Sequence, residues 1–180
     1  MSSYNVAVVG ATGVVGESIL NILEQRDFPV NELYPLASER SAGKKIMFKN
    51  KPIKVQNLSE FDFGQAHIGL FSAGGSVSAE YAPKAGEQGC IVIDNTSHFR
   101  YEDDIPLVVP EVNSPSIAKF RNRNIIANPN CSTIQMLVAL KPIYDAVVIK
   151  RINVSTYQAV SGTVKAAVED LARQTSDLLN

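Results

Sequence analysis

Short apolar runs and helix-like spacings follow one another along the first part of the chain. Residues 4 to 9, YNVAVV, form a β-branched apolar run that predicts a strand. Residues 14 to 25, VVGESILNILEQ, repeat apolar side chains at the spacing of one helical face, and ELYPLAS at residues 32 to 38 predicts a second strand. Together these elements form a βαβ unit of the length that a parallel crossover requires.

The alternation continues through the middle of the chain. Apolar runs at residues 67 to 75 and 90 to 95 flank a helical stretch near residues 76 to 88, and NIIA at residues 124 to 127 predicts another strand. Strands that alternate with helices favour a parallel sheet covered on both faces. The predicted fold class is therefore α/β, a Rossmann-type, doubly wound dinucleotide-binding domain. KKIMFKNKPIKV predicts a hairpin with its turn at residues 50 to 52.

The pattern changes toward the C-terminus. TIQMLVALKPIYDA at residues 133 to 146 is helix-like, whereas KRINVSTYQAV at residues 150 to 160 alternates as a half-exposed antiparallel strand does. Residues 163 to 179 predict an amphipathic helix. We therefore expect a dinucleotide-binding domain at residues 1 to 130, and a cysteine-containing helix with the start of an incomplete α+β domain at residues 131 to 180.

Composition and charge indicate which kinds of molecule the protein binds. The chain has 180 residues, 45% of them hydrophobic and 19% charged, with a formal net charge of -1, which is typical of a soluble globular protein. Without basic blocks it has no electrostatic signature of a nucleic acid or membrane partner, so we expect a small-molecule ligand. The first residues lack a secretory signal, and no segment reaches the roughly 20 apolar residues of a membrane span, so a cytoplasmic location is expected.

A glycine-rich loop joins the first strand to the first helix. GATGVVG spaces Gly10, Gly13 and Gly16 three apart, where a dinucleotide-binding turn needs close approach of the backbone to a pyrophosphate and of the helix to the strand. The helix N-terminus supplies free N–H groups for the phosphates. Thr12 either hydrogen-bonds phosphate or caps the helix. The alternative is that the glycines only make a tight βα turn.

The end of the second predicted strand bears on the choice of cofactor. Ser38, Glu39, Arg40 and Ser41 lie there, where a carboxylate favours the ribose hydroxyls of NAD and an arginine accommodates the 2′-phosphate of NADP. Arg40 with its two hydroxyl neighbours favours NADP, whereas Glu39 keeps NAD open. A solvated charge pair in a loop is the alternative.

A second loop of small residues closes the strand predicted near residue 70. SAGG contributes Ser72, Ala73 and Gly74, which allow a cofactor to lie close to the backbone at the carboxyl edge of the sheet. A plain flexible turn would have the same composition. The loop is therefore a candidate cofactor contact.

The chain has only two cysteines, and their surroundings differ. Cys90 opens the apolar run CIVID and is predicted to be a buried strand residue, and both are expected to be free thiols in a reducing compartment. Asn128 and Pro129 form a good N-cap and first-turn pair, so Cys131 should fall in the first turn of the next helix. There the N–H groups stabilise a thiolate or an oxyanion formed by its attack on a carbonyl. An inert small residue at a helix start is the alternative.

The motifs GATGVVG, SAGG, DNTSHFR, VPEVN, NPNCST and QAVSG occur in that order. In this order they resemble the bacterial form of aspartate-semialdehyde dehydrogenase, over roughly the N-terminal half of that family's chain. N-acetyl-γ-glutamyl-phosphate reductase shares the fold and the cysteine but typically has glycine before it, as NPGC. Asn130 argues against that family.

The resemblance implies an NADP-dependent oxidoreductase that interconverts aspartyl β-phosphate and aspartate β-semialdehyde, in lysine, threonine and methionine biosynthesis. Cys131 would attack the acyl phosphate, release phosphate and form a thioester, which hydride from NADPH reduces. Gln158 would orient the acyl group, and Arg100 and Asn130 would bind phosphate. The resemblance also implies a homodimer and no metal. It assigns the pyrophosphate to Thr12, Gly13, Val14 and Val15, and the nicotinamide end to Ser161 and Gly162.

Each of these roles has a structural alternative. Arg100 precedes YEDD and would otherwise be a surface ion pair, Gln158 the polar face of a strand, and Asn130 a helix cap. Residues 161 to 162 would otherwise be an ordinary strand-to-helix turn.

The resemblance also implies two groups that this sequence does not contain. The family's general acid/base is a histidine in its C-terminal half, beside an arginine for the substrate carboxylate. The only histidines here are His67, which begins a strand and is expected to be structural, and His98, which is not assigned as a base. Two alternatives to an active enzyme follow: an inactive NADP-binding fragment, or a dinucleotide sensor without chemistry.

Overall fold

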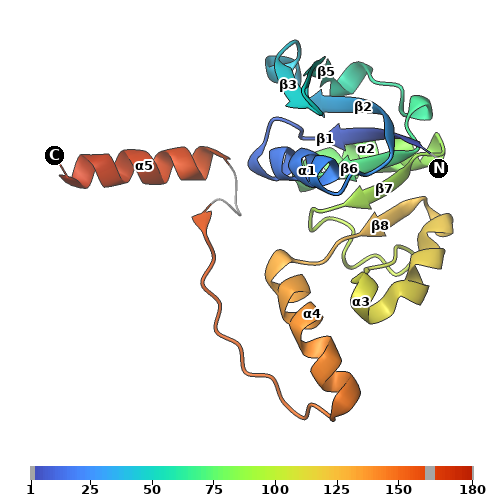
Figure 1. Ribbon diagram of the computed structural model, residues 1–180, viewed down its shortest axis with the longest axis vertical. Coiled ribbons are helices and arrows are strands. Elements are labelled where there is room, and N and C mark those ends of the chain that lie inside the picture. The colour runs from blue at the N-terminus through green and yellow to red at the C-terminus, as the bar shows by residue number, and fades with distance from the viewer. Residues whose placement is uncertain (1–2, 161–164, 180) are drawn as a thin grey trace. The chain divides into compact units, whose positions relative to one another are not determined.

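A computed structural model describes residues 3–160 and 165–179 of the chain (Figure 1). It divides into two compact units, residues 1–150 and 151–180, which are described separately below. No helix among the described residues is long and apolar enough to cross a membrane.

The first unit alternates strands and helices. Its strands are β1 (Tyr4–Val9), β2 (Val30–Ala37), β3 (Lys45–Phe48), β4 (Lys51–Lys54), β5 (Gln56–Asn57), β6 (Ile68–Phe71), β7 (Ile91–Asp94) and β8 (Ile125–Ala127). Its helices are α1 (Val14–Gln25), α2 (Gly75–Glu87), α3 (Pro110–Asn113) and α4 (Cys131–Ala146), with short 3₁₀ turns between them. The predicted helix at residues 14 to 25 and the first strand are confirmed residue for residue.

Six strands form one parallel sheet in the order β5-β2-β1-β6-β7-β8. Side chains alternate between its faces along β1, where Val6 and Val8 pack on one side and Ala7 and Val9 on the other, all fully buried. The first face is covered by α1 through Leu20 and by the β3–β4 hairpin. The second face is covered by α2 and by the aromatic residues of the 3₁₀ turns. The predicted α/β, doubly wound fold is confirmed.

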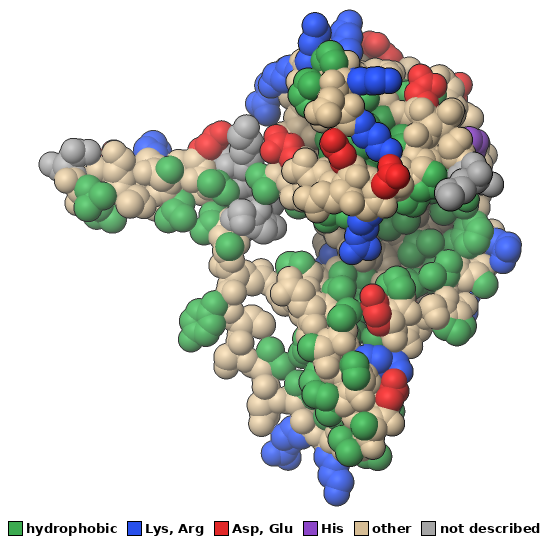
Figure 2. All heavy atoms as spheres, viewed as in Figure 1, with side chains coloured by type: hydrophobic (Ala, Val, Ile, Leu, Met, Phe, Trp, Pro, Cys, Tyr) green, Lys and Arg blue, Asp and Glu red, His purple; other side chains and the backbone are tan. Residues whose placement is uncertain are grey.

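The hairpin turn lies one residue earlier than the sequence predicted. Lys49 and Asn50 form the two-residue turn, with φ angles of 47° and 60°, and Pro52 lies inside β4 opposite Met47. A tight hairpin turn needs positive φ at both central residues, which the proline ring forbids. The predicted turn at residues 50 to 52 is therefore wrong. The exposed lysines of the hairpin gather at one end of the first unit (Figure 2).

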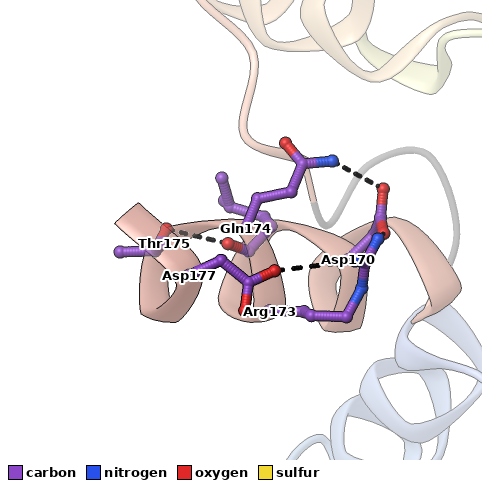
Figure 3. A network of polar contacts seen from close by, with 6 residues as sticks. Asp170, Arg173, Gln174, Thr175 and Asp177 are labelled. Atoms are coloured by element: carbon purple, nitrogen blue, oxygen red, sulfur yellow. Dashed lines mark hydrogen bonds and ion pairs between the residues drawn. The ribbon is translucent and has the colours of Figure 1, made fainter. Parts of the chain in front are cut away.

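The second unit contains α5 (Lys165–Leu179) after an extended segment. The predicted amphipathic helix is confirmed for its described part. Arg173 pairs with Asp170 and Asp177, and Gln174 donates to Asp170, so one side of α5 carries a polar network (Figure 3). The strand predicted at residues 150 to 160 is wrong, because no described strand pairs with these residues and an unpaired strand leaves its backbone groups to water.

Cys90 lies directly before β7 and is fully buried, as predicted. Burial raises the pKa of its thiol to about 12 from the ordinary value of 9.0. A raised pKa in the folded state stabilises the fold below the unfolded value and loses that stabilisation as the pH rises through the folded value. The side chain therefore remains a neutral thiol and is part of the core.

We expect the free energy of unfolding to fall between pH 9 and about 12 more steeply in the unmodified chain than in Cys90→Ala. The difference in slope should reach about 1.4 kcal/mol per pH unit, the effect of one proton. Urea unfolding followed by circular dichroism over this pH range measures both slopes. Parallel curves for the two proteins would show that Cys90 ionises as readily in the folded state as in the unfolded one.

Candidate functional site

All the strands of the main sheet end at the same edge, because they are parallel. The chain passes from β1 to β2 on one side of β1 and later returns to β6 on its other side. Ligands of such sheets bind where the order reverses, outside the carboxyl ends of the strands. The loops after β1 and β6 therefore mark the expected binding crevice.

The glycine loop approaches the loop after β6 at this point. A Cβ at Gly10, whose φ is +88°, would lie 3.1 Å from the backbone nitrogen of Ala73. A Cβ at Gly16 would lie 2.1 Å from the carbonyl oxygen of Gly10, so α1 packs directly against the turn. Both positions require glycine, and the cradle that results fits the close backbone approach of a pyrophosphate.

The start of α1 faces the same loop. Gly13 is its N-cap and no side chain caps the helix, so the capping role considered for Thr12 is wrong. Val14 and Val15 are the first helical residues and their side chains are exposed, at 39% and 37%. The first N–H groups of a helix have no partner within it, so this turn can bind phosphate oxygens.

The segment after β2 forms a 3₁₀ turn at Glu39–Ser41, with a hydrogen bond from Ser41 N to Ser38 O of 2.8 Å. Ser38 and Arg40 are exposed, whereas Ser41 is buried. Among the described residues, Arg40 makes no ion pair with Glu39, so its guanidinium can bind a phosphate at this edge.

The loop after β6 contains the predicted small residues. Ser72 donates to Val9 O at 3.1 Å and thereby joins the ends of β6 and β1. Ala73 contributes the backbone that faces Gly10. Gly74, with φ +97°, is the N-cap of α2. These contacts bring the loop and the glycine turn together, as the dinucleotide interpretation requires.

Arg100 is attached to the segment that leads to the cysteine. Its Nε donates to Asn128 O at 3.0 Å, and its Nη2 donates to Asn95 O at 3.2 Å. The Asn128 side chain donates to Asn95 Oδ1 at 2.6 Å, which closes the link between the loops after β7 and β8. The alternative of a surface ion pair with YEDD does not apply, because Arg123 is the cation that pairs with Glu102 there, at 3.9 Å.

Cys131 is the first residue of α4 and is exposed. The prediction that it lies in the first turn of a helix is confirmed, but the predicted N-cap is wrong. Asn130 is the N-cap, so the alternative of a helix cap stated for it above is confirmed, and its Oδ1 accepts from Ser132 N at 3.0 Å, whereas the Asn128 side chain is bound to Asn95. The side-chain amide of Asn130 still offers N–H donors beside the thiol.

The histidines have different surroundings. His67 Nδ1 accepts from Asn5 N at 2.9 Å, so the structural role expected for it is confirmed. His98 is exposed, and its ring packs edge-on against Phe99. Within the part of the chain that the structure describes, no group of His, Cys, Asp and Glu side chains is arranged to hold a metal ion.

Some predicted site residues belong to the second unit or lie outside the described residues. Gln158 belongs to the second unit and is exposed, so its role stays a prediction. Ser161 and Gly162 lie outside the described residues. In contrast, sequence reasoning missed a buried polar group formed by Ser78, Asp94 and Thr96. The signal available was the carboxylate that ends the apolar run CIVID.

Comparisons with known proteins agree with this geometry. The family model for the semialdehyde dehydrogenase NAD binding domain matches residues 5–120, and the model for the semialdehyde dehydrogenase dimerisation domain matches residues 140–180. Aspartate-semialdehyde dehydrogenase 2 of Vibrio cholerae is 68% identical over 177 residues, which are 98% of this chain and 52% of the relative.

Solved structures give the same result. Aspartate semialdehyde dehydrogenase II from V. cholerae, complexed with ASA, has a TM-score of 0.96 at 66% identity, over 100% of this chain and 54% of that chain. Aspartate semialdehyde dehydrogenase with NADP from Candida albicans has a TM-score of 0.70 at 29% identity, over 90% of this chain and 52% of that chain.

The sheet, its crossover and the glycine cradle place the first unit in the class of Rossmann-type dinucleotide-binding domains. Within this class the chain belongs to the semialdehyde dehydrogenase family, and the relatives it resembles are aspartate-semialdehyde dehydrogenases. The resemblance drawn from its motifs is thereby confirmed. The chain spans about half the length of the curated relatives it matches.

We expect Gly16→Ala to lower the affinity for a nicotinamide dinucleotide by at least about tenfold, because the new methyl group would displace the Gly10 carbonyl. Calorimetric titration measures the affinity, and circular dichroism checks that the variant is folded. Gly64→Ala is the matched control, since its Cβ would meet only the end of the Asp62 side chain at 3.2 Å. If Gly16→Ala is folded and its affinity for the dinucleotide is unchanged, the glycines serve only to make a tight βα turn.

Proposed function

We propose that this chain provides the cofactor-binding domain and the nucleophile of an NADP-dependent aspartate-semialdehyde dehydrogenase. The reaction is the reductive dephosphorylation of aspartyl β-phosphate to aspartate β-semialdehyde. The observation that carries the proposal is the position of Cys131, exposed at the start of α4 and beside a segment that Arg100 binds. The similarity to aspartate-semialdehyde dehydrogenases supports the choice of substrate.

Cys131 acts as the nucleophile in this mechanism. Its thiolate sulfur attacks the carbonyl carbon of the acyl phosphate, the bond from that carbon to the phosphate oxygen breaks, and phosphate leaves. The product is a thioester on Cys131. N–H groups at the start of α4 stabilise the oxyanion formed during attack. The dinucleotide, held at the glycine loop, would supply a hydride to the thioester carbon; the carbon–sulfur bond would then break, releasing the aldehyde and returning the Cys131 thiolate.

Arg100 and Asn130 bind the phosphate group in this proposal. Two backbone carbonyls accept from Nε and Nη2 of Arg100, so among the described residues its Nη1 donors are left for a phosphate oxygen. Asn130 uses its side-chain oxygen as a helix cap and keeps its amide nitrogen as a donor. Gln158 is assigned to orient the acyl group on the QAVSG motif alone.

The cofactor binds along the other half of the sheet edge. Gly10, Gly13 and Gly16 form a turn that would hold the pyrophosphate, and the first turn of α1 would supply the N–H donors. Thr12, Val14 and Val15 would line the pyrophosphate, Ser72, Ala73 and Gly74 would face it from the loop after β6, and Ser161 and Gly162 are assigned to the nicotinamide by their motif alone. NADP is preferred over NAD because Arg40 lies between Ser38 and Ser41 at the end of β2.

The remaining parts of the proposal follow from the family. Residues 1 to 130 form the cofactor domain, and residues 131 to 180 start the catalytic and dimerisation domain, to which the second family model corresponds in part. The enzyme is a homodimer of lysine, threonine and methionine biosynthesis. A cytoplasmic location suits a reaction that depends on a free thiol.

A cofactor-binding piece without turnover is the second candidate, because the chain spans only about half of its relatives. The two candidates differ in one assay. Production of NADPH from aspartate β-semialdehyde, phosphate and NADP requires the complete mechanism, whereas a titration that detects NADP binding without turnover supports the second candidate.

The nucleophile can be tested on this chain without a hydride step. Incubation with freshly prepared aspartyl β-phosphate should add one aspartyl group to Cys131, because thioester formation needs only the thiolate and the leaving phosphate. Mass spectrometry of the intact chain and of its peptides measures the adduct. Cys131→Ser should show none, and Cys90→Ala should behave as the unmodified chain. An adduct on lysines but not on Cys131 would exclude it as the nucleophile.

Arg40→Ala should lower the affinity for NADP by about tenfold or more and leave that for NAD nearly unchanged, since only NADP has the 2′-phosphate. Titrations with both cofactors measure the ratio. Lys84→Ala is a control that removes an exposed cation already paired with Glu80 at 3.0 Å. Equal losses for NAD and NADP would contradict the assignment of Arg40.

A further inference from the structure

Asp94 is a fully buried carboxyl group at the end of β7. Its Oδ1 accepts from Ser78 Oγ at 2.7 Å and from Thr96 N at 3.2 Å, and its Oδ2 accepts from Thr96 Oγ1 at 2.7 Å. Ser78 is fully buried on α2 and Thr96 is 9% exposed. A buried carboxylate is costly unless it is hydrogen-bonded in this way, so the group satisfies its own polar atoms.

The backbone around Asp94 leads to both contacts of Arg100. Asp94 O accepts from Asn128 N at 2.8 Å, and the next residue, Asn95, accepts from Arg100 Nη2. Asn128 O accepts from Arg100 Nε. Asn95 is joined to Asp94 by a peptide bond, and Asn128 is joined to it by a backbone hydrogen bond. Both carbonyls that bind the guanidinium therefore belong to residues held by Asp94.

Thr96 fixes the same turn from its other side. Its Oγ1 donates to Asp94 and also accepts from His98 N at 3.3 Å. Phe99, beside Arg100, is 2% exposed and belongs to the core. The path of the chain from Asp94 to Arg100 is thus fixed at Thr96 and again at Phe99.

We propose that Asp94, Ser78 and Thr96 form a positioning unit that directs the Arg100 guanidinium toward the phosphate. The inference rests on the proposed function, in which Arg100 binds that group. A guanidinium is planar, so two fixed donors determine the direction of the third. With Nε and Nη2 on carbonyls, the position of Nη1 depends on the turn that the Asp94 carboxylate organises.

A purely structural role would be served equally well by an apolar side chain of similar size, since buried charged groups add little to stability over well-packed hydrophobic ones. The carboxylate, in contrast, accepts from α2 and from the turn after β7 at the same time. Its removal should therefore loosen Arg100 more than it loosens the rest of the core.

The test measures the solvent exchange of the Arg100 Nε proton by NMR in this chain, with the signal assigned by its loss in Arg100→Lys. Thr96→Val keeps the shape of the side chain but removes the hydroxyl, and we expect exchange to become about tenfold faster. Thr96→Ser should restore slow exchange. Val55→Ala opens a cavity at a fully buried residue that does not belong to the group of Asp94, Ser78 and Thr96. It should leave the exchange rate of the Arg100 Nε proton unchanged.

Titration with inorganic phosphate, followed at the same signal, gives the second readout. We expect Thr96→Val to weaken phosphate binding by about tenfold and to leave the affinity for NADP within about twofold. Unchanged exchange in Thr96→Val, or equal acceleration in Val55→Ala, would overturn the positioning role. If the unmodified chain binds no phosphate, the phosphate site of the proposed function fails, whereas the exchange comparison still decides the role of Thr96.

Discussion

The close approach of two loops at the carboxyl edge of the sheet determines how the rest of the site is arranged. The turn after β1 packs against the backbone after β6 so closely that a Cβ at Gly10 would lie 3.1 Å from Ala73 N. The same turn admits α1 only because Gly16 has no side chain. As a result the start of a helix, two backbone turns and the ends of two adjacent strands share one small region. This is where a dinucleotide of the proposed kind fits.

The sheet edge is divided between two kinds of chemistry. Loops after β2, β1 and β6 carry the residues assigned to the cofactor, and loops after β7 and β8 carry Arg100 and Cys131. The order of the strands produces this division, because β7 and β8 lie on the side of β6 that faces away from β1. The hydrogen bonds from Arg100 to Asn95 and Asn128 then join the last two loops into one structure.

Local patterns predicted most of the fold. The run YNVAVV and the apolar spacing of residues 14 to 25 were sufficient for β1 and α1, because both depend on burial against the same sheet. The alternating pattern at residues 150 to 160 was not sufficient to predict a strand. A strand needs a second strand to pair with, and the local sequence does not show whether one is present. The predicted position of the hairpin turn is wrong because proline is typical of turns, whereas Pro52 lies in β4.

The parts of the candidate site that lie in one continuous segment were predictable from the sequence. The parts that combine residues from separate elements were not. The glycine loop and the helix start at Cys131 each occupy one continuous segment. The sequence predicts Asn128 as the N-cap and Asn130 as a cap only in the alternative to its phosphate role, because nothing in ANPNC shows that the Asn128 side chain is bound to Asn95, 33 residues earlier in the chain. The group around Asp94 was missed for the same reason, since Ser78 and Thr96 come from separate elements.

The edges of the main sheet have a consequence for association between chains. An exposed strand edge can pair with another molecule and start aggregation, and short or interrupted edge strands reduce this risk. The edge strands here are β5, with 2 residues, and β8, with 3, and Leu107 forms a bridge to Ala127 that covers the outer side of β8. In the hairpin, Lys45 lies opposite Lys54, and Pro52 lacks an N–H group. The described strands therefore offer no long, uncharged edge on which a second chain could extend the sheet.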